Sequence, residues 1–331
     1  MSLITNTPAT GWDRVTSITR SKVMPYVVHQ TMNDYPLLKR LLSKAVKKSG
    51  GSRIEAPITY KFKTQGGWYS GIEVLNAALE NTRTRAYWSW KQLFEPLVFS
   101  NIEIFQNHGD SGEQIVDLLR QEAEEVKDSL RNNFATSLYS DGTGDDGKEM
   151  DGLLAATDDG SNVATYGGIP FATYAWWQAQ YSALSAAISW AALATRYDEC
   201  KSGADVPNLI VTTEEVWTDL EALLEVAVRY NWGKNGGPQF DGGVPDTIRF
   251  RGSEIMSDEY CPSGRMFFLN DKYLKVVVAS KHPKYKTDPM GFTTTDLKEP
   301  SDQDGQVGFL LWWGNLINTR PSRTGQYASI S

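Results

Sequence analysis

The sequence predicts an α+β fold in which a long two-stranded hairpin is followed by one long helix and then by short helices and strands. Two runs that alternate apolar and polar residues, 54–62 and 82–94, indicate the hairpin. Apolar residues at three-to-four spacing over 111–139 indicate the long helix. Short apolar runs follow from residue 209 onward, and an apolar strand over 307–313 closes the order.

The alternation in the hairpin places its apolar side chains on one face. The first strand carries them at every second position from Ile54 to Phe62. The second, 82–94, carries Thr84, Ala86, Trp88, Trp90 and Phe94 on one side. The segment between the strands is polar and rich in glycine. Because a two-stranded hairpin has little core of its own, something outside it must cover its aromatic residues. These are Trp68, Tyr69, Trp88 and Trp90.

Residues 1–50 are predicted to form an extended arm that ends in a short helix. Asn33 and Asp34 are helix-capping residue types, and Pro36 suits a first helical turn. Gly50 and Gly51 end the helix. Its apolar face comprises Leu37, Leu38, Leu41, Leu42 and Val46.

Charge is distributed unevenly along the chain, whose net charge is −7. The segment 14–53 carries +8, which leaves −15 for the remainder. A basic arm on an acidic body suits either nucleic acid or the acidic body of a neighbouring chain. The second is favoured, because nothing beside the arm resembles a base-reading element.

The long helix is predicted to begin at Ser111, which forms a capping-box pair with Gln114, and to end near Tyr139. At about 1.5 Å per residue it extends about 40 Å, more than twice the length of an average globular helix. A helix of this length spans its domain like a spine.

The rest of the chain is predicted as a loop, two helices and several strands. The loop is Asp141–Gly152, and the helices are Tyr174–Tyr197 and Glu214–Tyr230, with a glycine-rich loop, Trp232–Gly243, after the second. The strands are Leu209–Thr212, Thr247–Arg251, Arg265–Leu269, Tyr273–Ala279 and Val307–Trp313, and a basic tail through Arg320 and Arg323 follows. Adjacent strand residues point to opposite faces, so Trp312 and Trp313 do not share one core.

No motif predicts catalysis, a cofactor or a metal. Gly109–Gly112 spells GDSG after His108, but capping of the long helix explains Ser111. The acidic loop from Asp141 lacks the glycine and glutamate positions of an EF-hand. The three histidines, His29, His108 and His282, lie far apart, and no phosphate-binding glycine motif occurs. We therefore predict no catalytic, cofactor-binding or metal-binding residues.

Cysteine content and hydropathy indicate a reducing, non-membrane location. Cys200 and Cys261 are the two cysteines and have no CxxC spacing. The N-terminus lacks the pattern of a signal peptide, and no run approaches the roughly 20 apolar residues of a membrane span. A soluble cytosolic product is expected.

Several strings in this order resemble the major capsid proteins of tailed double-stranded DNA phages. They are the basic arm, the hairpin over 53–91, the helix after HGDSGEQ, SLYSDGTG with GLLAA, PNLIVTTEEVWTDLEAL, TIRFRGSEIMSDEYCPSGRMFFLNDKYL and LLWWGNLINTRPSRTGQYASI. The resemblance covers nearly the whole chain. Encapsulins and the floor of herpesvirus capsids share this fold.

The resemblance implies a tailed-phage major capsid fold with an N-terminal arm, an extended β-hairpin loop, a long spine helix, a peripheral domain and an axial domain. The implied ranges are 1–50 for the arm, 51–92 for the hairpin, 93–164 for the peripheral domain with its spine helix, 165–300 for the axial domain, and 301–331 for a return strand and C-terminal tail. Residues 1–30, Trp68 and Tyr69 are then expected to contact mainly other chains.

The implied function is structural and not enzymatic: assembly through hexamers and pentamers into an icosahedral head around double-stranded DNA. The expected partners are further copies of the chain, a separate scaffolding protein, a portal, decoration proteins and non-specifically bound DNA, with no membrane. The expected location is the virion, after assembly in the host cytoplasm. Three alternatives stay open: an encapsulin shell, a cytosolic α+β enzyme, and a receptor-binding or tail protein.

Overall fold

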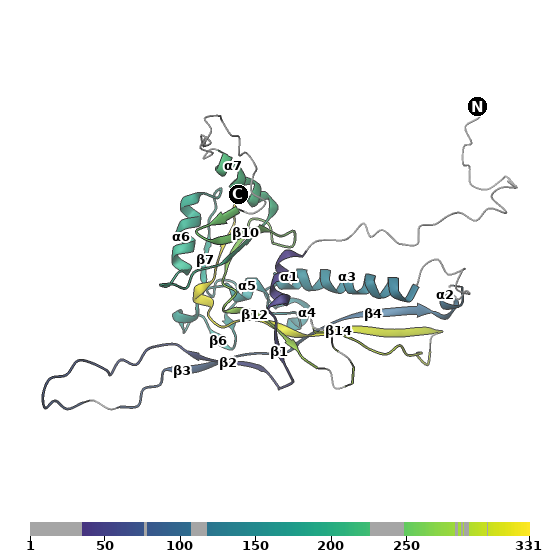
Figure 1. Cartoon of the computed structure of the whole chain (residues 1–331), viewed down its shortest axis with the longest axis horizontal. Helices are drawn as coiled ribbons and strands as arrows, with labels where there is room; N and C mark the ends of the chain where they lie inside the picture. Colours follow the sequence, from purple (N-terminus) through teal and green to yellow (C-terminus); the bar gives the residue numbers. More distant parts are fainter. Residues whose placement is uncertain are drawn as a thin grey trace, which may run out of the picture.

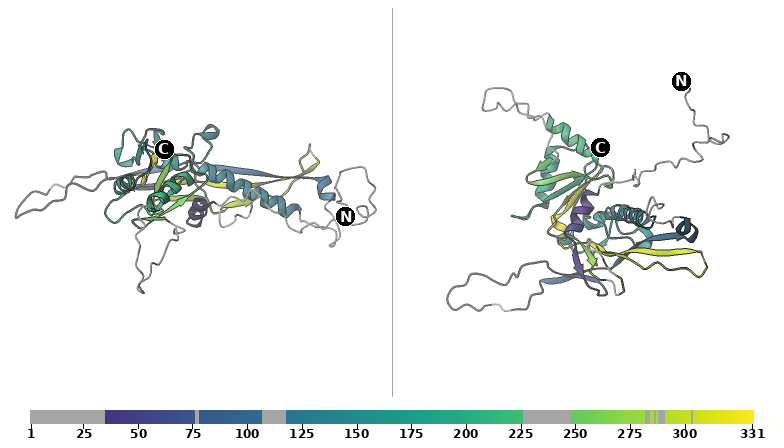
Figure 2. Two further views of the ribbon diagram at one scale, coloured as in Figure 1. Left: turned by 90° about the horizontal axis from the view of Figure 1, so that it is seen from above. Right: turned by 45° about the vertical axis from the view of Figure 1, so that its right-hand side comes forward.

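The computed structural model of the chain describes residues 35–75, 78–106, 118–225, 248–281, 284–285, 287, 291–302 and 304–331. The molecule is elongated (Figure 1). A hairpin projects from one end, and a long pair of strands extends toward the other (Figure 2). Helices and strands are mixed throughout, which confirms the predicted α+β class.

The helices are mostly short, with one exception that runs along the long strands (Figure 1). They are α1 (Pro36–Ser43), α2 (Asn101–Gln106), α3 (Leu118–Leu138), α4 (Gly144–Gly147), α5 (Leu153–Ala156), α6 (Trp190–Cys200) and α7 (Glu214–Glu225). Two 3-10 turns, η1 (Ala175–Trp177) and η2 (Pro321–Arg323), complete the described helical elements.

The strands form two larger sheets and two small hairpins. The first sheet contains β1 (Val46–Lys48), β12 (Leu274–Ala279), β14 (Gly305–Asn318), β13 (Phe292–Thr294) and β4 (Lys91–Ser100). The second has the order β7 (Gln180–Ala183), β15 (Gly325–Ala328), β11 (Met266–Leu269), β8 (Leu209–Thr212), β10 (Ser253–Ser257) and β9 (Ile248–Phe250). The hairpins are β2 (Ile54–Thr59) with β3 (Arg83–Trp88), and β5 (Thr165–Tyr166) with β6 (Ile169–Pro170).

Helix α3 covers one face of the long β4–β14 pair, which runs antiparallel from Gly305 opposite Ser100 to Gly314 opposite Lys91. The ring of Phe134 on α3 meets Trp312 on β14 edge to face, with centroids 4.5 Å apart. Glu95 on β4 accepts hydrogen bonds from the Ser129 hydroxyl (3.0 Å) and the Asn133 amide (3.2 Å). The predicted spine helix is confirmed over 118–138, and its predicted first turn lies outside the described residues.

Helix α1 is held between the two sheets. Its residues Leu37, Leu38, Leu41 and Leu42 are buried. Arg40 forms ion pairs with Glu254 (2.6 Å) and Asp271 (3.0 Å), and Lys44 pairs with Asp271 (2.6 Å). The predicted helix is thus confirmed, but it ends at Ser43 because the chain then joins the first sheet as β1. The capping types Asn33 and Asp34 lie outside the described residues.

The predicted helix over 174–197 is wrong in its first half. Residues 180–183 form β7, which pairs in parallel with β15, and Ser185 then adopts a positive φ of 51°. Helix α6 begins only after Ser189, whose hydroxyl accepts from the backbone N–H of Ala192 at 3.2 Å. Sheet pairing with a distant strand therefore overrides the local helical preference of this alanine-rich segment.

The prediction of a basic C-terminal tail after Trp313 is also wrong. The end of this segment forms β15, a buried strand between β7 and β11 in the second sheet. The predicted strands at 209–212, 265–269 and 273–279 are confirmed within two residues. Residues 226–247, which contain the end of the third predicted helix and the glycine-rich loop, lie outside the described residues.

Candidate assembly surfaces

The hairpin stem, which consists of β2 and β3, is buried on one face by its own chain. Ile54 lies opposite Trp88, and Ala56 lies opposite Ala86. Ile54, Ala86 and Trp88 are all buried, and Trp88 meets Tyr166 edge to face with centroids 5.8 Å apart. The predicted alternation is thus confirmed over 54–59 and 83–88. The predicted second strand, 82–94, is wrong as one strand, because residues 91–94 belong to β4 and pair with β14. Trp88 was expected to need cover from outside the hairpin, and Tyr166 of the same chain contributes that cover.

The hairpin apex, residues 61–80, presents apolar side chains to solvent. Trp68, Ile72 and Leu79 are fully exposed, and Phe62 is exposed to 92%. Tyr69, Val74 and Leu75 are also exposed. Exposed apolar residues gathered in one segment mark a contact surface, since single scattered ones are normal but a cluster is not. Contact of Trp68 and Tyr69 with other chains stays a prediction.

Side-chain hydrogen bonds tie the two arms of the apex together. The Glu80 carboxylate accepts from the backbone N–H of Thr64 (2.9 Å), the Thr64 hydroxyl (3.0 Å) and Lys61 Nζ (2.9 Å). The Gln65 side-chain oxygen accepts from the backbone N–H of Ala78 at 2.9 Å. The backbone bond from Thr64, followed by the bond from Lys61, lowers the pKa of Glu80 to about 2. These bonds join residues 61–65 to residues 78–80, although the apex has no core of its own.

Replacing Glu80 by glutamine is expected to loosen the apex. The pKa of Glu80 is lowered in the folded state. Its stabilisation of the apex is therefore fully present above the ordinary pKa of a glutamate and is lost as the pH falls toward about 2. Hydrogen-exchange mass spectrometry at pH 7 should show several-fold faster exchange over 61–80 in E80Q. Pepsin cleavage of the wild-type apex should accelerate below about pH 4. The matched control is E73Q on the same apex, and equal exchange in E80Q and E73Q would contradict the assignment.

A second apolar surface lies at the opposite end of the molecule, on the β4–β14 face that points away from α3. Because side chains alternate across a strand, Phe94, Pro96 and Val98 point away from α3, whereas Leu97 and Phe99 are buried beneath it. The residues opposite them are Leu311, Phe309 and Val307. We call these six residues the outer face.

The outer face is exposed where its rings meet. Phe94 and Val98 are exposed to 61% and 56%, and Phe94 lies edge to face with Phe309 at 6.3 Å. Trp313 points the same way and is half-buried, whereas Trp312 is buried, so the predicted opposite orientation of these two rings is confirmed. The sequence analysis missed the outer face. Its signal was the segment 93–99, in which both alternating sets of positions are apolar apart from Glu95.

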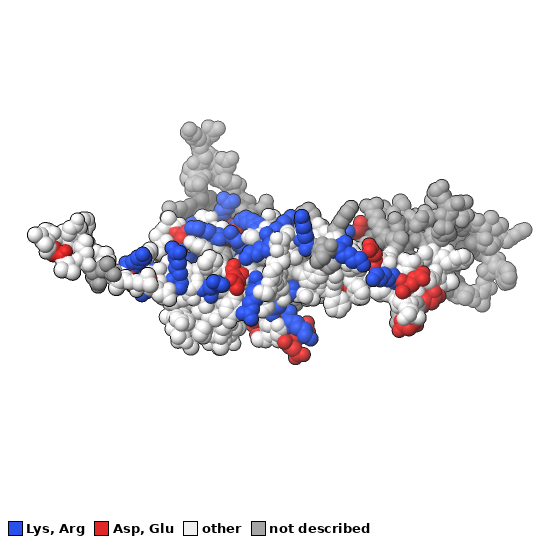
Figure 3. All heavy atoms as spheres, turned by 90° about the horizontal axis from the view of Figure 1, so that it is seen from below, with Lys and Arg blue, Asp and Glu red and all other residues white. Residues whose placement is uncertain are grey.

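Charged side chains are distributed unevenly along the molecule (Figure 3). On the face of the molecule that Figure 3 shows, lysine and arginine side chains cover the middle and the hairpin stem. Acidic side chains gather at the end opposite the hairpin. The exposed basic residues of the hairpin include Lys61, Lys63, Arg83 and Arg85. The exposed acidic residues beside the outer face include Glu103, Asp296, Glu299, Asp302 and Asp304.

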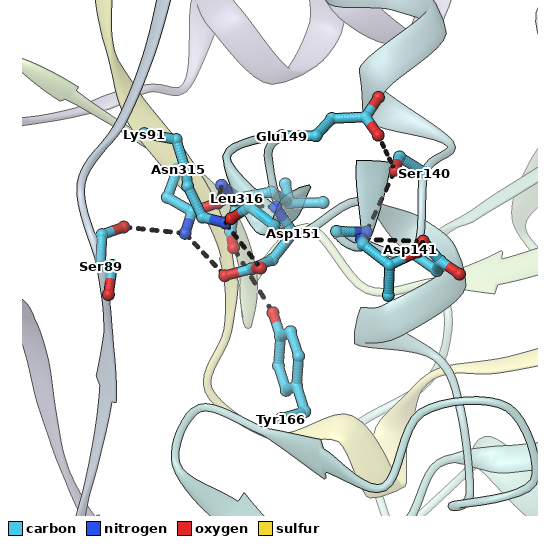
Figure 4. Close-up of polar contacts among 12 residues, drawn as sticks. Ser89, Lys91, Ser140, Asp141, Glu149, Asp151, Tyr166, Asn315 and Leu316 are labelled. Carbon is cyan, nitrogen blue, oxygen red and sulfur yellow. Dashed lines mark hydrogen bonds and ion pairs between the residues drawn. The ribbon is translucent and has the colours of Figure 1, made fainter. Parts of the chain in front are cut away.

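A buried polar cluster joins the hairpin base to the first sheet (Figure 4). The Asn315 amide donates to the Ser89 carbonyl (3.0 Å) and to Asp151 Oδ2 (2.7 Å), and Asn315 Oδ1 accepts from the backbone N–H of Asp151 (3.1 Å). Lys91 Nζ donates to the Gly147 carbonyl at 2.7 Å and lies 3.6 Å from Asp151. These groups satisfy one another, so the cluster serves to fix the strands in place.

The other residues considered as candidate functional groups have structural roles wherever they fall within the described part of the chain. Asp141 accepts from the backbone N–H and hydroxyl of Thr143, and these bonds, which form a turn, lower its pKa. Cys200 and Cys261 are buried free thiols whose pKa values burial raises. Ser111 and the histidines lie outside the described residues. Within the described residues, no group of three or more acidic, histidine or cysteine side chains is placed to hold a metal, and no helix is long and apolar enough to cross a bilayer.

The fold is that of the major capsid proteins of tailed phages, as the sequence predicts. The chain is similar to a protein of the cyanophage A-1(L) capsid, with 17% identity, a TM-score of 0.72, and coverage of 95% of this chain and 98% of that one. It is also similar to the capsid of a native GTA particle, with 12% identity, a TM-score of 0.64, and coverage of 95% and 96%. The SrpI encapsulin of Synechococcus elongatus PCC 7942 aligns at 8% identity and a TM-score of 0.58, over 96% and 94% of the two chains. No family model and no curated protein sequence matches the chain.

Proposed function

We propose that the chain is a structural shell subunit, the major capsid protein of a tailed phage. Many copies would assemble through hexamers and pentamers into an icosahedral head that encloses double-stranded DNA. The observation that carries the proposal is the hairpin apex, whose described large apolar side chains are exposed to solvent.

The two apolar surfaces support a head-to-tail contact between copies. The apex and the outer face lie at opposite ends of the elongated chain (Figure 1). A contact that joins two different surfaces of identical chains generates a ring when the rotation between copies closes. The exposed lysine and arginine side chains of the hairpin and the acidic side chains beside the outer face are complementary in charge, which favours this pairing over apex-to-apex contact.

The domain division is part of the proposal. Residues 1–50 form the arm, 51–92 the hairpin, 93–164 the peripheral domain, 165–300 the axial domain, and 301–331 the return strand of the peripheral domain and the C-terminal tail. The β4–β14 pair with α3 supports the peripheral unit, and the second sheet supports the axial unit. Within 301–331, β15 packs in the second sheet and thus with the axial unit.

The proposed partners beyond other copies are a separate scaffolding protein, a portal, decoration proteins and the packaged DNA. The proposed location is the virion, with assembly in the host cytoplasm. No catalytic role is assigned. The segment 14–34, which carries part of the basic charge of the arm, lies outside the described residues, so its preference for a neighbouring chain over DNA rests on the sequence.

An encapsulin-type compartment is the second candidate. It is favoured by the likeness to the SrpI encapsulin over nearly the whole of both chains. The TM-score to the cyanophage capsid protein is higher, 0.72 against 0.58, and this difference places the phage head first.

Negative-stain microscopy of the purified protein tests the proposal. The chain is expressed alone and together with the neighbouring phage genes. Closed shells, or rings of five and six copies, are the expected result. Nuclease-protected double-stranded DNA inside the shells would separate a phage head from an encapsulin. A stable monomer under both conditions would overturn the proposal.

A further inference from the structure

The hairpin leaves the body at Tyr60, where its hydrogen-bonded ladder ends. The backbone N–H of Tyr60 donates to the Thr82 carbonyl at 3.1 Å, and its hydroxyl donates to the Asn81 carbonyl at 2.8 Å. The Tyr60 ring stacks on Trp176, with centroids 5.4 Å apart and planes inclined by 22°. Tyr60 therefore belongs to the hairpin and also contacts the body.

Trp176 is held in place by its buried neighbour in the body of the molecule. It lies in η1 beside Trp177, which is buried and donates its indole N–H to the Tyr166 carbonyl at 2.9 Å. The rings of Trp176 and Trp177 meet edge to face at 5.6 Å. Because Trp177 is anchored in the core, Trp176 is a fixed platform under the hairpin.

The hairpin touches the same part of the body at a second point. The backbone N–H of Tyr87 donates to the Gly167 carbonyl at 3.0 Å. Gly168 has a φ of 72°, and a Cβ built there would lie 2.3 Å from Tyr87 Cζ, so the Tyr87 ring fits against the backbone only because this residue is glycine. The β5–β6 turn therefore supports the hairpin near its base (Figure 1).

The contacts at Tyr87 and at Tyr60 together fix the angle between the hairpin and the body. Tyr87 pairs with Glu55, and Tyr60 lies five residues further along the first strand. At about 3.3 Å per residue, the two supports are about 17 Å apart. Trp68 lies eight residues beyond Tyr60, so about 25 Å of hairpin extends past the outer support. A tilt of about 10° at Tyr60 would move the apex by roughly 4 Å, enough to break side-chain contacts that require atoms within about 4.5 Å.

We propose that Trp176 is a positioning residue that sets the angle at which the hairpin leaves the body, through its stack on Tyr60. The consequence for shells rests on the proposed function, in which the apex docks on another copy. A hairpin held at one angle loses less conformational freedom on docking, and it brings each copy to its neighbour in the same orientation. Removal of the stack should therefore broaden the range of shell shapes.

The experiment compares W176A and Y60A, which delete the stack from either side, with W176F, which keeps a ring and leaves the bond from the Tyr60 hydroxyl to the Asn81 carbonyl intact. Hydrogen-exchange mass spectrometry on the purified full chain follows residues 58–62 and 80–84. Because an aromatic pair contributes modestly beyond its buried area, exchange should rise roughly three- to tenfold in both alanine variants and stay within about twofold of wild type in W176F. The double variant should exchange no faster than Y60A, because Y60A already removes the stack together with the hydroxyl bond to Asn81.

The matched control is W190A, which removes another stacked tryptophan, Trp190 on Phe250 (5.7 Å, 18°), away from the hairpin. W190A should leave hairpin exchange unchanged. Unchanged hairpin exchange in W176A, or an equal rise in W190A, would overturn the proposal.

Electron microscopy of assembled particles supplies the second readout. W176A should lower the fraction of uniform closed shells at least threefold, and W176F should restore it. Uniform shells from W176A despite faster hairpin exchange would overturn the link to shell shape. If the wild-type chain forms no shells at all, the proposed function fails, and hairpin exchange still decides the role of Trp176.

Discussion

Replacing Trp68 and Tyr69 together by alanine is expected to abolish closed shells and leave the subunit itself intact. Both side chains are exposed in their own chain, so their loss should change the free energy of unfolding by no more than about 0.5 kcal/mol. In an assembled shell, the same rings would act as buried aromatic anchors, and truncation of such anchors costs about 2 kcal/mol or more per contact. Repeated at every subunit, that loss exceeds what weak shell contacts tolerate. Size-exclusion chromatography and electron microscopy measure the assembled fraction.

The control for this double variant is W68F with Y69F, which keeps two rings and should assemble. A further test replaces Phe94 and Phe309 on the outer face by serine. If the outer face receives the apex, this variant should lose assembly as well, since it removes the exposed ring pair. Normal shells from W68A/Y69A would show that the apex is not an assembly element.

Replacing Trp312 by alanine is expected to destabilise the subunit by about 3–5 kcal/mol. Trp312 is buried between the first sheet and α3, where its ring contacts Phe134. Deletion of the ring leaves a cavity that the antiparallel β4–β14 pair and the long helix cannot close without moving. Urea unfolding of the unassembled subunit, followed by circular dichroism, measures the loss.

The neighbouring residue provides the matched control. Trp313 is half-buried on the opposite face of the same strand, so W313A should cost less than about half as much as W312A. A similar loss in both variants would mean that the two faces of the strand are equally important to the fold of the subunit. F134A should resemble W312A, because it removes the other ring of the same contact.

The elements predicted correctly are those that a local pattern specifies. The alternation through Ile54, Ala56 and Ile58 predicted which face of the hairpin is apolar, and those positions pair with Trp88, Ala86 and Thr84. Three-to-four spacing predicted α1 and the described part of α3, and continuous apolar runs predicted β8 and β12. Each of these patterns repeats within a few residues, so neighbouring side chains suffice to define it.

The errors occur where a distant segment decides the conformation. Residues 180–183 have the composition of a helix, but they pair with β15, which lies more than 140 residues later in the chain. Residues 325–328 fall in the predicted basic tail, but they form a strand that is buried between two other strands. Local propensities differ by less than about 1 kcal/mol per residue, so the burial of a strand in a sheet outweighs them.

The candidate site divides in the same way. The sequence by itself determined that an exposed, aromatic-bearing hairpin precedes a long amphipathic helix, because both periodicities and the glycine-rich apex are local. Only the tertiary structure decided that Trp88 is covered from within while Trp68 is left exposed. It also decided that the outer face lies at the far end of the molecule and that Trp176 supports Tyr60. Those relations join residues up to more than 200 positions apart, and they depend on packing, which no short stretch of sequence encodes.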